Sequence, residues 1–350
     1  MRYLKCGLVV AAIFVGGARL YAQQPARSEL DAALDSAVVS ADSAMRDTVA
    51  ARVARYTQSP LAVPLASVKA ELRLVPLFGS EDPRRSAHVQ RALALFDKIS
   101  KDVQASGVGK EAWCALKSFE AEQWMREGNP DASLREIDAC LAVYEATIAD
   151  QRTTPDIRLI ERQDFAAMFA RLPVIFAQRA RARYALVNHR MLDTVRALHW
   201  VVPPIGATQR IWSSEVTIVE FAVPECNPCD RANRAIRQLL ERSRARDLSA
   251  LVVTYLNDTT QNDSAIATIR RTVSAQLGER VSIANVTWSS QDNQYLLPRP
   301  ELFLRYGANG SPTLFLVDRN GIVRDVIEST DPDIGLRIVH GIARIRRTSQ

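Results

Sequence analysis

Two cysteines three positions apart are the residues of this chain best suited to chemistry. Cys226 and Cys229 enclose Asn227 and Pro228. A Cys-x-x-Cys spacing across the first turn of a helix lets two sulfurs bond without rebuilding the backbone, so the pair can cycle between dithiol and disulfide. The spacing alone also fits a static disulfide or half of a zinc site. The elements around the pair must therefore decide between these interpretations.

The segment that follows the pair predicts unequal roles for the two sulfurs. One apolar face of a helix is formed by Cys229, Ala232, Ile236, Leu239 and Leu240. Such a face packs against a sheet, so Cys229 is predicted to point inward. Cys226 is predicted at the helix N-terminus, where unpaired N–H groups and the helix dipole lower the pKa of a thiol. Cys226 is therefore the expected nucleophile, and Cys229 is expected to resolve the mixed disulfide.

The C-terminal half predicts a mixed α/β sheet. Strands are expected at Val216–Val223, Ala250–Leu256 and Val281–Trp288, with helices at Cys226–Ser243 and Ser264–Leu277. This alternation predicts parallel strands covered by helices. Two further strands, Thr313–Val317 and Ile322–Val326, flank an Asp-Arg-Asn-Gly turn and predict an antiparallel hairpin. Asp331 and Pro332 are expected to begin a closing helix.

Two segments of this half resemble the thioredoxin superfamily. The run VEFAVPECNPC, from Val219 to Cys229, resembles the thioredoxin active-site segment. The run RYGANGSPTLFLVD, from Arg305 to Asp318, is similar to the family's second signature. The additional strand at Val281–Trp288 resembles the TlpA-like periplasmic branch. The resemblance covers about residues 200 to 346 and implies an α/β thioredoxin fold with thiol-disulfide oxidoreductase activity.

The resemblance also implies roles for residues around the cysteines. Pro312 corresponds to the cis-proline that faces the two sulfurs, and Ser311 to a residue whose backbone binds a substrate peptide. Glu220 matches the buried acid that exchanges a proton with Cys229. Desolvation on an apolar strand is expected to raise the pKa of Glu220. The alternative is that the Glu220 side chain simply reaches the edge of the sheet.

One position departs from the family pattern. Glu225 stands directly before Cys226, where the family usually has Trp. We group Glu225 with Ser311 as residues expected beside bound substrate. Its carboxylate opposes the helix dipole and should raise the pKa of Cys226, which makes the disulfide harder to reduce. The Pro of Cys-Asn-Pro-Cys also resembles reducing members, so a reductase or isomerase is expected.

The N-terminal half predicts an all-α helical domain that precedes the thioredoxin-like one. Its clearest feature is a hairpin of two helices, Lys110–Glu127 and Ala132–Ile148, with Asp131 capping the second. Counted from Pro130, Cys114 and Cys140 lie about six positions out of register, or on the order of 9 Å. That separation slightly exceeds the usual reach of a disulfide. A structural Cys114–Cys140 disulfide, after a small shift of one helix, and two buried thiols both remain open.

The first 22 residues predict an export signal. Arg2 and Lys5 precede an apolar run, Leu8–Val15, and Ala22 ends a cleavage-like stretch. An uncleaved membrane anchor is the alternative. The expected organisation is a signal peptide at 1–22, a helical domain at 23–200 and a thioredoxin-like domain at 201–350, in the periplasm or secreted. Persistent disulfides are expected in that compartment.

Composition narrows the class of partner. The net charge is +6, but Lys and Arg are scattered among Asp and Glu, so no nucleic acid is expected. The four His residues are isolated, and neither a metal nor another cofactor is expected. The expected partners are thiols and disulfides of client proteins and an upstream thiol reductase, for which a membrane-bound enzyme is one candidate.

Two other functions compete with redox exchange. The first is a redox-inactive secreted interaction module whose helical domain binds a partner. The second is a thiol peroxidase, which is disfavoured because Val223 stands three residues before Cys226, where that chemistry uses Thr or Ser.

Overall fold

The computed structural model describes most of the chain after residue 42. The described residues are 43–58, 63–79, 81–154, 156–191, 199–203, 211–222, 229–257, 263–278, 280–288, 300–308, 312–328 and 332–348. The predicted signal peptide at 1–22 lies outside them. Within these ranges, no helix has both the length and the apolar character needed to cross a membrane.

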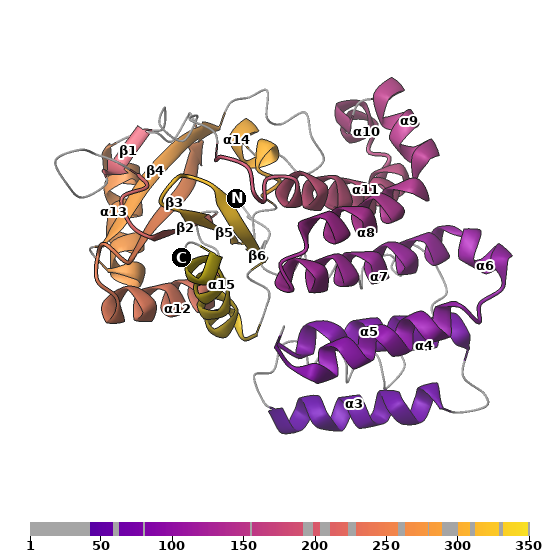
Figure 1. The fold of residues 1–350 in the computed structure, drawn as a ribbon. Coiled ribbons are helices and arrows are strands. Elements are labelled where there is room, and N and C mark those ends of the chain that lie inside the picture. The colour runs from indigo at the N-terminus through magenta and orange to yellow at the C-terminus, as the bar shows by residue number, and fades with distance from the viewer. Residues whose placement is uncertain are drawn as a thin grey trace.

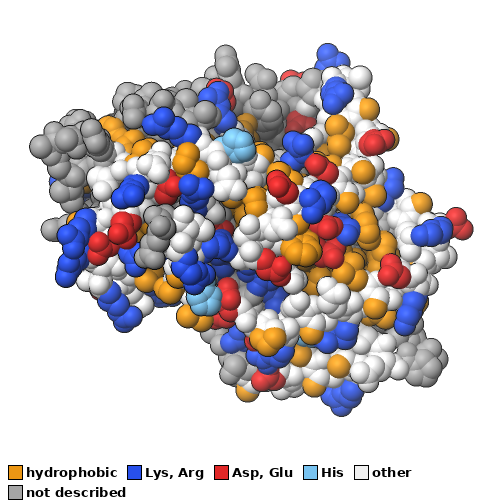
Figure 2. All heavy atoms as spheres, viewed as in Figure 1, with side chains coloured by type: hydrophobic (Ala, Val, Ile, Leu, Met, Phe, Trp, Pro, Cys, Tyr) orange, Lys and Arg blue, Asp and Glu red, His pale blue; other side chains and the backbone are white. Residues whose placement is uncertain are grey.

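The first half of the described chain is helical, as predicted. The helices are α3 (Ser43–Thr57), α4 (Pro64–Leu74), α5 (Pro83–Phe96), α6 (Lys101–Ala105), α7 (Gly107–Arg126), α8 (Pro130–Ala142), α9 (Glu145–Thr153), α10 (Asp156–Arg162) and α11 (Phe165–Tyr184), with a 3-10 turn at Val75–Leu77. They stack in layers, with α7, α8 and α11 nearest the sheet and α3 farthest from it (Figure 1). Figure 2 shows basic and acidic side chains interspersed over the visible face, as the scattered charge pattern predicts.

The predicted hairpin is α7 and α8, but its cap and its end differ from the prediction. Asn129, not Asp131, caps α8, because its side chain accepts a hydrogen bond from the N–H of Ala132 at 3.1 Å. Pro130 takes the first helical position, which suits a residue without an N–H group. The chain turns after Ala142 and begins α9 at Glu145, so the predicted helix to Ile148 is two helices.

Cys114 and Cys140 join α7 to α8 as a disulfide, with their Cα atoms 4.5 Å apart. The predicted separation of about 9 Å is wrong because the turn is centred near Gly128 rather than Pro130. Ser133, which donates to the carbonyl of Ala121 at 2.8 Å, shows the same alignment of the two helices. Counted from Gly128, the two cysteines are nearly in register, and no shift of a helix is needed.

Removing this disulfide is expected to cost stability. The bond spans 26 residues. In the chain-entropy model, closing a loop of that size raises the free energy of the unfolded chain by about 3–4 kcal/mol. The double variant Cys114→Ala/Cys140→Ala should therefore unfold at a clearly lower urea concentration than the oxidised native protein. Mass spectrometry of a non-reduced digest checks the premise, and recovery of both residues as alkylated thiols would contradict it.

The second half forms one six-stranded sheet in the order β1-β4-β3-β2-β5-β6. Its strands are β1 (His199–Val202), β2 (Val216–Phe221), β3 (Leu248–Asn257), β4 (Val281–Trp288), β5 (Thr313–Asp318) and β6 (Val323–Glu328). Its helices are α12 (Cys229–Arg242), α13 (Asp263–Leu277), α14 (Glu301–Arg305) and α15 (Ile334–Thr348). The prediction of parallel β2, β3 and β4 followed by an antiparallel hairpin is confirmed.

Three elements differ from the sequence prediction. Strand β1, which was not predicted, pairs antiparallel with β4, and it begins before the predicted domain boundary at residue 201. The short helix α14 was not predicted. Helix α15 begins at Ile334 and not at Pro332, which lies in a turn with Asp333.

The sheet is buried on both faces. Helices α12, α13 and α15 cover one face, where Val216 and Ile218 of β2 point. Helix α14 and the helical half cover the other, where Val219 and Phe221 point. One apolar core runs from the sheet into the helical half, and it includes Cys140 of α8. The two halves of the described chain are therefore joined by shared hydrophobic packing.

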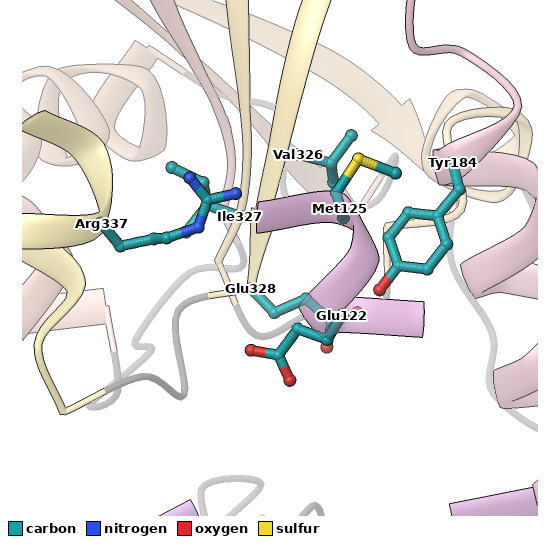
Figure 3. Close-up of a pocket in the computed structure, with 7 residues that line it drawn as sticks. All are labelled: Glu122, Met125, Tyr184, Val326, Ile327, Glu328 and Arg337. Carbon is teal, nitrogen blue, oxygen red and sulfur yellow. The ribbon is translucent and has the colours of Figure 1, made fainter. Parts of the chain in front are cut away.

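Polar contacts reinforce this junction. Arg183 of α11 is buried, donates to the carbonyl of Gly307 at 2.5 Å and pairs with Glu328 of β6. A small pocket lies at the same junction (Figure 3). It is lined by Glu122, Met125, Tyr184, Val326, Ile327, Glu328 and Arg337. No described cysteine is among these residues.

Candidate active site

Cys229 is the first described residue of α12 and is buried, so its predicted inward position is confirmed, whereas the predicted helix start at Cys226 lies outside the described residues. It is 3% exposed and packs on the apolar face of α12, while the arginines at 231, 234, 237 and 242 are exposed. Cys229 is disulfide-bonded. Its partner lies outside the described residues, because the other described cysteines, Cys114 and Cys140, bond to each other.

Three predicted site residues lie outside the described ranges. These are Cys226, Glu225 and Ser311. Pro312 is described and buried, and it directly precedes β5. Thr313, the next residue, pairs with Phe221 at the end of β2. The Ser311–Pro312 peptide bond involves a residue outside the described ranges, so the predicted cis isomer stays a prediction.

Glu220 is a buried acid in the middle of the sheet. It lies on β2 between Val252 of β3 and Leu314 of β5, and it is 1% exposed. The alternative in which it reaches the edge of the sheet is therefore wrong. Burial raises the pKa of Glu220 to about 8, because the apolar surroundings disfavour its charged form. The side chain therefore carries a proton that it can exchange near neutral pH.

Asn233 connects this acid to the helix of Cys229, and the sequence analysis missed it. It lies one helical turn after Cys229 and is 6% exposed. One end of its carboxamide lies 3.0 and 3.1 Å from the two carboxyl oxygens of Glu220. The other end lies 2.8 Å from Oε1 of Gln276 on α13. A polar residue at i+4 on the apolar face of α12 was the available signal.

The opposite face of β2 carries an aromatic cluster. The ring of Phe221 lies 5.1 Å from that of Phe303, 5.0 Å from that of Tyr306 and 5.6 Å from that of Phe315, measured between centroids. Phe303 and Tyr306 lie in and directly after α14. The cluster fixes the end of β2, which leads toward the cysteine pair.

Gly307 allows the turn after Tyr306, in the segment Arg305–Asp318 that resembles the second family signature. Its φ is +63°, a conformation that side chains disfavour. A Cβ atom at this position would lie 2.2 Å from the carbonyl oxygen of Arg179 on α11. The turn can therefore press against the helical half only because residue 307 lacks a side chain.

The described residues place a buried sulfur and a buried carboxyl group on neighbouring elements. Cys229 begins α12, and Asn233 of the same helix holds the carboxyl of Glu220 one turn away. A carboxyl group with a pKa of about 8 can take a proton from a thiol or return it near neutral pH. The described side of the site therefore combines a sulfur with an acid–base group.

Comparison with known proteins found similarity only in structure. No protein family model matches the sequence. No curated protein matches it either. A thiol-disulfide isomerase from Corynebacterium glutamicum is 16% identical, with a TM-score of 0.32, over 41% of this chain and 88% of that one. A secreted disulfide oxidoreductase from Mycobacterium tuberculosis is 11% identical, with a TM-score of 0.28, over 43% and 98% of the two chains.

A third solved structure is similar over the same share of the chain. A Chlorobium tepidum structure assigned as a thiol:disulfide interchange protein of the DsbE type is 20% identical, with a TM-score of 0.30. It covers 42% of this chain and 94% of that one. At these scores the matches carry no argument about function. The thioredoxin-like fold follows from the strand order, the α12 position after β2 and the β5–β6 hairpin.

Proposed function

We propose that this chain is an exported thiol-disulfide oxidoreductase that reduces or isomerises protein disulfides through Cys226 and Cys229. One observation carries the proposal. Buried Cys229 begins the helix whose next turn holds the buried acid Glu220 through Asn233. A structural disulfide has no need of an acid–base group with a raised pKa, whereas dithiol exchange must move a proton at the resolving sulfur.

The proposed reduction proceeds in two sulfur transfers. The Cys226 thiolate attacks a client disulfide, which forms a mixed disulfide and releases one client sulfur as a thiolate. The Cys229 thiol then gives its proton to the Glu220 carboxylate, and the Cys229 thiolate attacks the Cys226 sulfur. The second client sulfur leaves as a thiolate and is protonated. Two electrons pass to the client, and a Cys226–Cys229 disulfide remains.

Sustained turnover requires a second partner. The Cys226–Cys229 disulfide must be reduced again by an upstream thiol reductase, and a membrane-bound enzyme is one candidate. Export through the predicted signal at residues 1–22 places both partners outside the cytoplasm. The proposed clients are folded or folding proteins with disulfides. Ser311 and Glu225 are expected beside the bound client peptide.

Redox titration tests the proposed direction of electron flow. Glu225 disfavours the Cys226 thiolate, and stabilising the disulfide relative to the thiolate lowers the reduction potential. In glutathione or dithiothreitol buffers, the Cys226–Cys229 couple should titrate nearer to the about −270 mV of thioredoxin than to the about −120 mV of a strong oxidant. A potential near the upper value would contradict the reductase or isomerase proposal.

Glu220→Gln is expected to slow reduction of client disulfides, because glutamine cannot accept the Cys229 proton. With a pKa of about 8, roughly one Glu220 in ten is ionised at pH 7, and the fraction rises through pH 8. The ratio of native to variant rates should therefore increase with pH across this window, reaching at least about 10-fold. Stopped-flow reduction of a disulfide peptide by the prereduced protein measures it.

Stability supplies the control for this variant. Folded Glu220 keeps its proton up to about pH 8, whereas the unfolded side chain loses it near 4.5. Native stability should therefore fall as pH rises between these values, and the glutamine variant should be the more stable protein above them. A native and a variant protein with equal rates at every pH would remove Glu220 from the mechanism.

A further inference from the structure

A chain of side-chain amides leads from buried Glu220 to the surface. Asn233 of α12 contacts Glu220 and, at 2.8 Å, Oε1 of Gln276 on α13. Nε2 of Gln276 in turn donates to Oδ1 of Asp230 at 3.1 Å. Asp230 is exposed in the first turn of α12. The chain thus joins two acids, one buried and one in solvent, through two groups that can each reverse their donor and acceptor ends.

The surface end of the chain has a fixed polarity. An ionised carboxylate only accepts hydrogen bonds. Asp230 therefore requires the nitrogen of Gln276, which turns Oε1 of Gln276 toward Asn233. Asn233 must then donate to Gln276 with Nδ2, at 2.8 Å. The Oδ1 atom of Asn233, which can only accept a hydrogen bond, then faces the carboxyl group of Glu220.

That orientation is satisfied only when Glu220 is protonated. The carboxyl O–H then donates to Oδ1 of Asn233, and every member of the chain has a partner. When Glu220 is ionised, Asn233 must instead turn its nitrogen toward it, where it donates to the two oxygens at 3.1 and 3.0 Å. Gln276 must then also reverse, and its oxygen faces the carboxylate of Asp230.

We propose that Asn233 and Gln276 are positioning residues that carry the charge state of Asp230 to Glu220 and favour its protonated form. The proposal rests on the proposed function only where it assigns Glu220 to proton exchange with Cys229. Its consequence depends on the direction of exchange: the carboxylate that accepts the Cys229 proton during client reduction forms only when the amide chain reverses, whereas the proton held on Glu220 is available to Cys229 when the disulfide is reduced again.

Among the described residues around Glu220, the amide chain supplies the polar contact with its carboxyl group. Val252 and Leu314 flank it on β3 and β5, and α15 contributes Ile334, Ile338, Ile342 and Ile345 to the apolar core on this face. Helix α12 brings Cys229, Asn233 and, through Gln276, Asp230. Among the described residues, Arg337 of α15 is committed to Asp325, with which it makes bonds of 2.6 and 2.7 Å. Burial raises the pKa of Glu220 in the same direction as the proposed chain.

Asp230→Asn tests the proposal, because asparagine can donate as well as accept and so lets the chain reverse. We expect the titration midpoint of Glu220 to fall by about one pH unit, the equivalent of one hydrogen bond. The midpoint is followed by the carboxyl ¹³C shift of glutamate-labelled oxidised protein, with Glu220→Gln to assign the signal. Gln276→Leu, which cuts the chain, should lower the midpoint by a similar amount.

The double variant separates the chain from a simple charge effect. In the Gln276→Leu background, Asp230→Asn should add no further shift. Glu241→Gln removes an equal charge from the exposed side of α12 outside the chain, and it should leave the midpoint unchanged. A midpoint unmoved in Asp230→Asn, or a shift that persists at full size after Gln276→Leu, would overturn the proposal.

This titration does not depend on the proposed activity. The midpoint of Glu220 can be measured even if the protein reduces no disulfide. If the protein is active, its pH–rate profile in Asp230→Asn should move to lower pH by the same amount. A moved midpoint with no disulfide exchange would therefore contradict the proposed function and leave the amide chain in place.

Discussion

Cys229→Ser is expected to abolish turnover while leaving the first attack intact. Serine cannot form the second sulfur–sulfur bond, so the mixed disulfide between Cys226 and a client has no resolving thiol. Catalytic reduction should fall by at least about 10³-fold, as expected when a member of the bond-making machinery is lost. The buried position of Cys229, 3% exposed, keeps it from meeting a large client first. Turbidity of reduced insulin measures the turnover.

The matched variant is Cys226→Ser, which should also lose turnover but for a different reason. Without the proposed nucleophile, no mixed disulfide can form at all. The two variants should therefore be equally inactive and differ only in whether they retain a client. Native-like activity in either one would contradict the assignment of unequal roles to the two sulfurs.

Asp325→Ala is expected to destabilise the fold by about 3–5 kcal/mol, because it leaves a buried charge without its partner. Asp325 of β6 is fully buried and accepts two bonds from Arg337 of α15, at 2.6 and 2.7 Å. A second arginine of α15, Arg344, approaches it at 2.6 Å. Asp325 therefore bonds α15 to the edge strand of the sheet. Without it, the positive charge of Arg337, which is 3% exposed, has no buried counterion.

Urea unfolding measures this effect against a matched control. Arg237 and Glu241 form an exposed pair at 2.8 Å on α12, and Arg237→Ala should change the free energy of unfolding by less than about 1 kcal/mol. Asp325→Asn keeps the shape of the side chain and should fall between the two. A loss in Asp325→Ala no larger than that of Arg237→Ala would show that the buried cluster contributes little.

The regular elements of the second half could be predicted because they bury apolar surface with a clear period. The bounds of β4, Val281–Trp288, agree with the prediction, and the β5–β6 hairpin lies at the predicted turn. There Asp318 accepts from the N–H of Asn320 at 2.8 Å and of Ile322 at 3.0 Å, which fixes the turn. Strand β1 and helix α14 are four and five residues long. Segments that short leave too few periodic positions to be detected.

Helix ends and helix register were harder to predict because several signals compete there. Asn129, Pro130 and Asp131 are all helix-starting residues, and only the structure shows that Asn129 is the cap. That choice moves the centre of the hairpin and brings Cys114 and Cys140 to a Cα separation of 4.5 Å. A shift of two residues in the position of the turn therefore determines whether Cys114 and Cys140 are close enough to form a disulfide.

Some features of the candidate site could likewise be predicted from the local sequence, whereas others depend on tertiary contacts. The inward position of Cys229 follows from the apolar period of its own helix, and burial of Glu220 from its strand. The partnership of Asn233 with Gln276 joins residues 43 positions apart. Asn233 is marked only as a polar residue on an apolar helix face, and the role of each amide comes from what faces it across the packed helices.

Trapping of clients by Cys229→Ser is the direct test of exchange through Cys226. The protein is incubated with an extract of its own compartment or with a disulfide peptide, alkylated without reduction, and digested for mass spectrometry. We expect mixed disulfides whose sulfur on this chain is that of Cys226, and no such adducts in Cys226→Ser or in the double variant. Absence of adducts in Cys229→Ser, or adducts that persist without Cys226, would show that Cys226 is not the nucleophile.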